Sequence, residues 1–168
     1  MESNKSKRVT KILLVLYLIF ITWVILFKMS TDFQNIGTSR RINLKPFGAS
    51  VIINGKIDLS EIYLNIAAFM PLGIYVSALK ENWNFIQKAA PAFFVSLAFE
   101  TAQYILAVGV TDITDLLGNT LGGVIGVAFY WLLSKILKDH TIKVINILAA
   151  AGTVCILALA GILLVFNW

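Results

Sequence analysis

The stretch Ala89–Val110, AAPAFFVSLAFETAQYILAVGV, is apolar along most of its length, and its one ionisable side chain is Glu100. A run of about 18 or more apolar residues is long enough to cross the hydrocarbon core of a bilayer, so it predicts a transmembrane helix. A carboxylate at that depth is costly, and where one occurs it indicates a functional site.

Four further apolar runs flank this stretch: Ile12–Phe27, Ile62–Leu79, Leu116–Ser134 and Val144–Phe166. The chain of 168 residues is 58% hydrophobic and only 14% charged, which is more apolar than a soluble core of this size requires. We therefore predict a single all-α domain that is a polytopic membrane bundle. Its predicted helices are at about residues 12–28, 62–79, 89–110, 116–134 and 144–166, with an outer loop at 29–61.

The basic residues lie at the ends of the predicted helices, which is a pattern of membrane topology and excludes a nucleic-acid-binding face. Nine of the fourteen fall in the segments that share a side with the N-terminus: Lys5, Lys7, Arg8, Lys11, Lys80, Lys88, Lys135, Lys138 and Lys143. The positive-inside rule then predicts a multi-pass membrane protein with a cytoplasmic N-terminus.

Neither a disulfide within the chain nor a zinc site built from Cys and His is expected, because Cys155 and His140 are the only residues of their kinds. Carboxylate oxygens also bind hard cations, but the acidic residues do not show a spacing that requires a metal. No set of nucleophile and base and no phosphate-binding loop is evident. We therefore expect no cofactor and no metal, and we leave open whether the protein is an enzyme.

Polar residues of separate predicted helices converge on the outer side of the membrane in this topology. Ser96, Glu100 and Gln103 share one helix face, since they lie at positions i, i+4 and i+7. With Asn65, Asp112, Asp115 and Asn119 they are predicted to line an outward-facing polar pocket. The loop residues Arg40, Arg41, Asn43 and Lys45 are predicted to cover it.

Each of these residues also has a purely structural interpretation, and the sequence leaves both open. Glu100 could form a hydrogen bond between helices, and Asn65 could link two helices in the same way. Asp112 and Asp115 suit the N-terminus of a helix, where side-chain oxygens accept from free N–H groups. The loop cations could contact anionic lipid headgroups instead of a specific ligand.

Small residues predict where the helices pack most closely. Gly118, Gly122 and Gly126 repeat at a spacing of four, which lets two helix backbones approach each other in lipid. In the second helix, Pro71 removes one backbone hydrogen bond and is expected to kink or loosen the helix beside Gly73.

Several ordered motifs together resemble the VanZ-like family of bacterial membrane proteins. They are Asn43-Leu44-Lys45-Pro46-Phe47, Asn65 followed by Phe69-Met70-Pro71-Leu72-Gly73, Ser96-x-x-x-Glu100-x-x-Gln103, and Thr111-Asp112-Ile113-Thr114-Asp115 followed by Asn119 and Gly122-Gly123. The resemblance covers roughly residues 10 to 135. It implies a membrane factor associated with resistance to glycopeptide antibiotics, teicoplanin in particular.

The resulting hypothesis is an envelope factor whose polar pocket binds an envelope lipid or a glycopeptide, with the lipid bilayer as its other partner. Two alternatives stay open. One is a small transporter or membrane enzyme that acts on a lipid-linked substrate through Glu100. The other is a scaffold in which the polar residues only hold the helices together.

Overall fold

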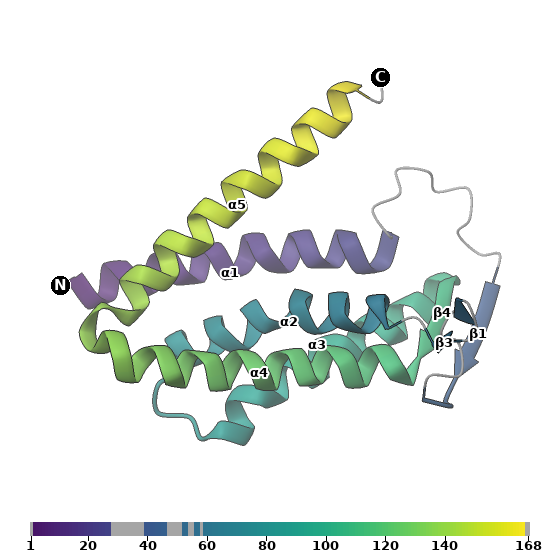
Figure 1. The fold of residues 1–168 in the computed structure, drawn as a ribbon, viewed down its shortest axis with the longest axis horizontal. Coiled ribbons are helices and arrows are strands. Elements are labelled where there is room, and N and C mark those ends of the chain that lie inside the picture. Colours follow the sequence, from purple (N-terminus) through teal and green to yellow (C-terminus); the bar gives the residue numbers. More distant parts are fainter. Residues whose placement is uncertain (1, 28–38, 47–51, 54–55, 58, 167–168) are drawn as a thin grey trace.

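The computed structural model describes residues 2–27, 39–46, 52–53, 56–57 and 59–166. Five α-helices dominate it: α1 (Glu2–Phe27), α2 (Ser60–Leu79), α3 (Phe85–Leu106), α4 (Ile113–Leu137) and α5 (Thr141–Phe166), with a short 3₁₀ helix, η2 (Lys138–His140), before the last (Figure 1). The short strands are β1 (Ser39–Asn43), β2 (Ile52–Ile53), β3 (Lys56–Ile57) and β4 (Val108–Asp112). The predicted fold class, an all-α polytopic bundle, is confirmed.

Four segments of the described chain are long and apolar enough to cross a membrane: Asn4–Leu26, Ser60–Leu79, Phe85–Leu106 and Ile113–Cys155. The last segment contains α4, η2 and the first half of α5. The sequence predicted five separate runs, and the structure accordingly has five helices, of which α4 and α5 follow each other with only η2 between them.

Helices α2 and α4 form the closest helix pair, and they run parallel although α3 lies between them in sequence. A Cβ atom at Gly122 would clash with the carbonyl oxygen of Ile66, and one at Gly126 with the carbonyl oxygen of Met70. Gly73 on α2 faces the backbone of Gly123 in the same way. Glycine is therefore required at this crossing, because the two backbones meet without side chains between them.

The buried core lies where α1, α2 and α3 pack beside this pair. It includes Ile21, Phe69, Leu72, Val76, Ala92 and Phe99, all buried. The rings of Phe69 and Phe99 meet edge to face, with centroids 6.2 Å apart, which is a favourable geometry for two aromatic side chains. This contact holds α3 against α2 and so positions the polar face of α3.

The third helix ends earlier than the sequence predicted, and residues 107–110 are not helical. Ala107 adopts a left-handed conformation with φ 52°, which terminates α3. Val108–Asp112 then form β4, which pairs in parallel with β1, so that Arg40 is opposite Gly109 and Asn43 is opposite Asp112. We call the end of the bundle that carries β1 and β4 the strand end (Figure 1).

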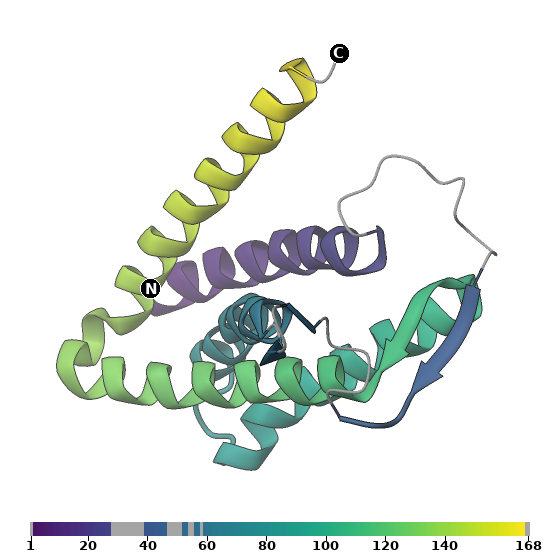
Figure 2. The ribbon, with the colours of Figure 1, turned by 45° about the vertical axis from the view of Figure 1, so that its right-hand side comes forward.

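The opposite end carries many basic residues, and we call it the basic end; it comprises residues 4–11, 80–88 and 135–143. Two side chains hold α1 and α5 together there: Thr10 Oγ1 donates to Asn146 Oδ1 at 2.9 Å, and Asn146 Nδ2 donates to the Ser6 carbonyl at 2.9 Å. From this contact α5 leads away from the other helices, as both ribbon views show (Figures 1 and 2).

The predicted helix boundaries also need correction at their N-terminal ends. Helices α2, α3 and α5 begin at residues 60, 85 and 141, and not at 62, 89 and 144. Helix α1 begins at Glu2 and not near residue 12, because its polar first turns continue the helix beyond the apolar run. Helix α4 begins at Ile113, directly after its capping residue Asp112.

Helix α2 continues as one helix through Pro71, so the proline does not break it. Near this residue the hydroxyl of Tyr17 on α1 donates to the Ala68 carbonyl at 2.8 Å. The carbonyl that Pro71, which has no N–H, leaves without an intrahelical donor is that of Ala67, so the Tyr17 bond adds a contact between α1 and α2 one residue further along.

Candidate functional site

The strand end gathers carboxylate and amide side chains from three helices and two strands. The most direct contact is between α2 and α4, where Asn65 Nδ2 donates to Asp115 Oδ1 at 2.7 Å. Both residues are half-buried. They lie next to the glycine crossing, on the side of the strand end, since a Cβ atom at Gly118 would be 3.5 Å from the Cβ of Asn65. The register of α2 on α4 therefore brings this pair together.

Glu100 connects α3 to the start of α4. Its Oε2 accepts from the backbone N–H of Asp112 at 2.8 Å, and its own carbonyl accepts from Thr111 Oγ1 at 3.1 Å. Only 4% of Glu100 is exposed, so its carboxyl group faces the protein and not lipid. Asp112 and Asp115 both interact electrostatically with this carboxylate, which places three acidic side chains in one region.

Asp112 acts as the N-cap of α4, as the structural interpretation of this residue expected. Its Oδ1 accepts from the Thr114 N–H at 2.8 Å. Its Oδ2 accepts from Asn43 Nδ2 at 3.1 Å, so the same carboxylate also binds strand β1. The backbone N–H of Asp112, which a capping box would satisfy from within α4, donates to Glu100 instead. The cap of α4 is thus shared with α3.

A second polar contact lies one helical turn deeper. Asn119 Nδ2 donates to Ser96 Oγ at 2.9 Å, and both residues are almost fully buried. The amide oxygen of the same side chain, Asn119 Oδ1, accepts no hydrogen bond within the described residues. An acceptor this deeply buried is usually hydrogen-bonded in folded proteins.

Gln103, which the sequence grouped with Ser96 and Glu100, is buried on the same face of α3 but contacts a different helix. Its Nε2 donates to the Ile25 carbonyl of α1 at 3.1 Å, while its Oε1 has no hydrogen-bond partner in the described part of the chain. Gln103 therefore links α3 to α1 and is not in the Asn65–Asp115 contact.

The predicted loop residues are described only in part. Asn43 joins the site through Asp112, and its Oδ1 accepts from the backbone N–H of Lys45 at 3.2 Å, while Lys45 itself is exposed. The side chains of Arg40 and Arg41 lie outside the described residues, although their backbone is in β1. Most of the predicted outer loop, residues 28–38, 47–51, 54–55 and 58, is likewise outside them.

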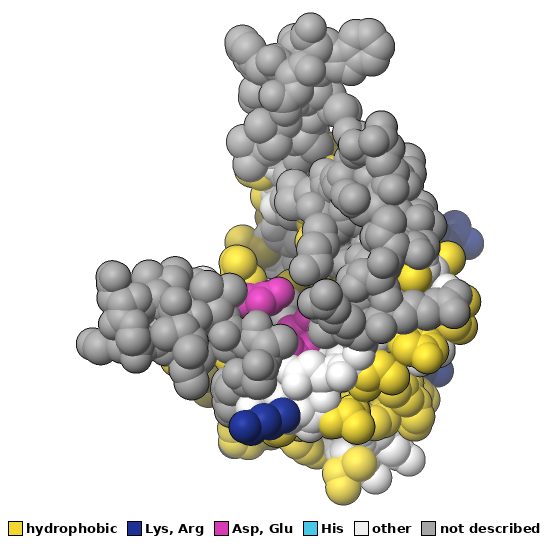
Figure 3. All heavy atoms as spheres, turned by 90° about the vertical axis from the view of Figure 1, so that its right-hand side faces the viewer, with side chains coloured by type: hydrophobic (Ala, Val, Ile, Leu, Met, Phe, Trp, Pro, Cys, Tyr) yellow, Lys and Arg dark blue, Asp and Glu magenta, His cyan; other side chains and the backbone are white. Residues whose placement is uncertain are grey.

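The polar network becomes more buried with depth. Asn43, Asp112 and Asp115 are half-buried at the strand end, whereas Glu100 and Asn119 are buried behind them. Figure 3 looks onto this end and shows acidic side chains at its surface. The acidic residues described here do not form a group of three that could share a metal ion.

Two cavities lie elsewhere in the described part of the chain. One, of about 620 Å³, is between α1, α2, α4 and α5, and the other, of about 570 Å³, is at the basic end beside Glu81 and Lys88. Of the predicted site and helix-packing residues, only Pro71 lines either of them. The polar network and the large apolar cavity are therefore separate features.

Two polar contacts were not predicted from the sequence. Thr111 directly follows the run predicted for the third helix, and its bond back to the Glu100 carbonyl was not expected; the Thr10–Asn146 contact joins the first and last helices. The sequence did carry a signal for the Thr111 contact, since Val108-Gly109-Val110-Thr111 is rich in β-branched residues, which favour strands. The Thr10–Asn146 contact had a weaker signal, which was the isolated Asn146 in an otherwise apolar run.

Comparison with known proteins identifies the family of this chain. A family model described as VanZ/LLP1 matches residues 14–134. The chain is 35% identical over 132 residues to "Protein VanZ" of Enterococcus faecium, an alignment that covers 77% of this chain and 78% of that protein. No solved structure matches the chain. With this similarity extending over all the polar residues of the strand end, the chain belongs to the VanZ/LLP1 family of membrane proteins.

Proposed function

We propose that this protein is a bacterial plasma-membrane factor that contributes to glycopeptide resistance, against teicoplanin in particular, through the polar network of its strand end. Membership of the VanZ/LLP1 family supports the activity. In this proposal the N-terminus is cytoplasmic, so that the strand end faces outward. The excess of basic residues at the opposite end of the bundle supports that orientation.

One observation carries the choice of site. Carboxylates and amides from β1, α2, α3 and α4 meet at the strand end through the Asn65–Asp115 and Glu100–Asp112–Asn43 contacts. These groups are mainly acceptors, and the buried amide oxygen of Asn119 behind them has no donor within the described residues. A ligand that donates hydrogen bonds, through sugar hydroxyls or an amine, fits this arrangement.

The test is a growth assay with teicoplanin and vancomycin in cells that express the wild type, Glu100→Gln or Glu100→Ala. The matched control is Glu81→Gln, which removes a carboxylate at the basic end, where Glu81 pairs with Lys7 at 3.2 Å. Membrane levels of each variant are measured in parallel. Loss of a hydrogen bond to a charged group weakens binding by about tenfold or more, so Glu100→Gln should lose most protection against teicoplanin.

The scaffold interpretation predicts a different result for the same variants. Glu100 Oε2 accepts from a backbone N–H, and a glutamine oxygen can accept from it equally well. If Glu100→Gln protects fully and Glu100→Ala does not, the side chain acts as a structural link. If Glu100→Ala also protects cells as well as the wild type does, the polar network is not the site of activity.

A further inference from the structure

The smaller cavity lies at the basic end, between the C-terminus of α2, the first turns of α3 and the last turns of α4, and we call it the basic-end pocket. Its volume of about 570 Å³ is within the range of ligand pockets, which is about 300–1,000 Å³. Phe85 of α3 and Val127, Ala128 and Trp131 of α4 form its apolar walls. Its remaining lining is polar and includes charged side chains, so its chemistry indicates a ligand.

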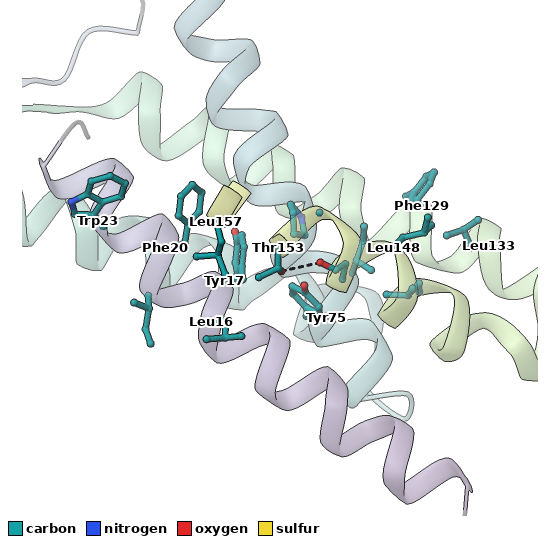
Figure 4. Close-up of a pocket in the computed structure, with 16 residues that line it drawn as sticks. Leu16, Tyr17, Phe20, Trp23, Tyr75, Phe129, Leu133, Leu148, Thr153 and Leu157 are labelled. Carbon is teal, nitrogen blue, oxygen red and sulfur yellow. Dashed lines mark hydrogen bonds between the residues drawn. The ribbon is translucent and has the colours of Figure 1, made fainter. Parts of the chain in front are cut away.

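The larger cavity, between α1, α2, α4 and α5, gives no such indication. Figure 4 shows aliphatic and aromatic side chains on its walls, among them Leu16, Phe20 and Leu148, and none of the described residues that line it is charged. The Thr153 hydroxyl there already donates to the carbonyl of Ala149 at 2.8 Å (Figure 4). The charges of the basic-end pocket are therefore what distinguish the two cavities.

Two ionisable side chains line the basic-end pocket, and only one of the two charges is neutralised within it. The carboxylate of Glu81 pairs with Lys7 at 3.2 Å. Lys88 is half-buried, and its Nζ donates to the carbonyl oxygen of Glu81 at 3.1 Å. An ammonium group has three donors, and Lys88 forms no ion pair within the described part of the chain. The lining thus presents a positive charge with unused donors.

Two residues of α4 add to this positive and donating character. Tyr130 lines the pocket and is only 9% exposed, yet its hydroxyl makes no hydrogen bond to another described residue. Its electrostatic interaction with Glu81 places that hydroxyl on the side of the lysine. Lys135 lies two turns after Ala128, on the same face of α4, and its Nζ is 3.6 Å from the centre of the Trp131 ring. A second cation therefore lies against a wall of the pocket.

The pocket also lies at the depth of lipid headgroups. The segment that can span a membrane along α2 ends at Leu79, and the one along α3 begins at Phe85. Phe85 and Trp131 are 52% and 57% exposed, and aromatic side chains at the ends of membrane helices lie at the boundary between headgroups and acyl chains. A water-soluble anion would use the cation of this pocket but not these apolar walls.

We propose that the basic-end pocket binds an anionic phospholipid, with its phosphate beside Lys88 and the Tyr130 hydroxyl and its acyl chain along Phe85 and Trp131. Basic pockets between membrane helices are the arrangement that recognises anionic lipid headgroups. Lys135, beside Trp131, adds to the attraction. The proposal does not depend on the function of the strand end.

Trp131 lines the pocket and provides the readout. We would use the full-length chain with Trp23→Phe, Trp83→Phe and Trp168→Phe, reconstituted in vesicles that contain a low fraction of lipid with brominated acyl chains, since bromine quenches nearby tryptophan fluorescence. Brominated phosphatidylglycerol should quench Trp131 at a lower fraction than brominated phosphatidylcholine, by roughly fivefold for each lysine that attracts the phosphate. Equal quenching by the two lipids would overturn the proposal.

Two pairs of lysines separate a specific site from the general charge of the basic end. Lys88→Gln with Lys135→Gln removes two charges at the pocket, and Lys11→Gln with Lys143→Gln removes two charges at the same end from residues that line neither cavity. The first double variant should lower the preference for phosphatidylglycerol at least fivefold more than the second. An equal loss in both would show that the lipid responds to the surface charge and not to the pocket.

Two exposed alanines supply a matched pair that tests the apolar walls. Ala128 lines the pocket, whereas Ala98 of α3 lines neither cavity. Ala128→Phe places a ring in the pocket and should abolish the preference for the anionic lipid, while Ala98→Phe should keep it. If Ala128→Phe keeps the preference, or if both variants lose it, the lipid does not bind in the pocket.

A last measurement separates a lipid from a soluble phosphate ester. Glycerol phosphate, added to vesicles that contain brominated phosphatidylglycerol, should leave the quenching of Trp131 unchanged, because it has no acyl chain to contact the walls. If millimolar glycerol phosphate relieves the quenching, the pocket is a site for soluble phosphate esters and the assignment to a phospholipid is wrong.

Discussion

Substitution of Gly126 by alanine tests the crossing that positions the whole polar network. A Cβ atom there would collide with the carbonyl oxygen of Met70 and would lie 3.2 Å from the Cα of Gly73. Both neighbours are backbone atoms, which cannot rotate away as a flexible side chain can. The added methyl group is therefore accommodated only if α2 moves away from α4.

The expected change in the free energy of unfolding follows from two opposing effects. Overpacking a tight contact destabilises a protein by about 1–3 kcal/mol. Alanine in place of glycine within a helix stabilises it by about 1 kcal/mol. Gly161→Ala gains only the second effect, because its Cβ atom meets nothing within 4 Å. We therefore expect Gly126→Ala to be less stable than Gly161→Ala by the overpacking contribution alone, about 1–3 kcal/mol.

The assay is equilibrium unfolding of the purified protein in mild detergent by titration with sodium dodecyl sulfate, followed by the helical circular dichroism signal. Gly122→Ala should behave like Gly126→Ala, since its Cβ atom would collide with the Ile66 carbonyl. If Gly126→Ala and Gly122→Ala are as stable as Gly161→Ala, the close α2–α4 approach is not what holds this register.

Two further variants test single hydrogen bonds by the same unfolding assay. Asn65→Ala removes the donor that lies 2.7 Å from Asp115 and should destabilise the protein by about 1–3 kcal/mol, and unchanged stability would show that the contact contributes nothing. Tyr17→Phe removes the donor to the Ala68 carbonyl and should cost about 0.5–1.5 kcal/mol; Tyr104→Phe, at a position 42% exposed, is the control, and equal effects of the two would contradict this interpretation.

Hydropathy was sufficient to predict the helices but not where each one ends. The apolar run of the third helix continues without a break from Leu106 through Ala107 to Val110, so composition alone does not mark the change from helix to strand. That change depends on the left-handed turn at Ala107 and on pairing with β1, which lies far earlier in the sequence. Both are tertiary effects, and a local pattern carries little information about them.

The spacing of polar residues predicted which side chains share a face but not what each one contacts. Ser96, Glu100 and Gln103 are all buried on α3, yet they meet Asn119, the Asp112 backbone and the α1 backbone respectively. Partner choice depends on how far each helix is displaced along its axis relative to its neighbours. The glycine contacts of α4 determine that displacement, and no spacing within a single helix reveals it.

The parallel pairing of β1 with β4 has a consequence for biosynthesis. Parallel strands require a crossover, and here the crossover consists of α2 and α3. Residues 39–43 leave the ribosome well before residues 108–112, so their main-chain partners have not yet emerged when α2 does. Joining of the two strands must therefore be a late event in assembly, and it completes the polar network only after both intervening helices are in place.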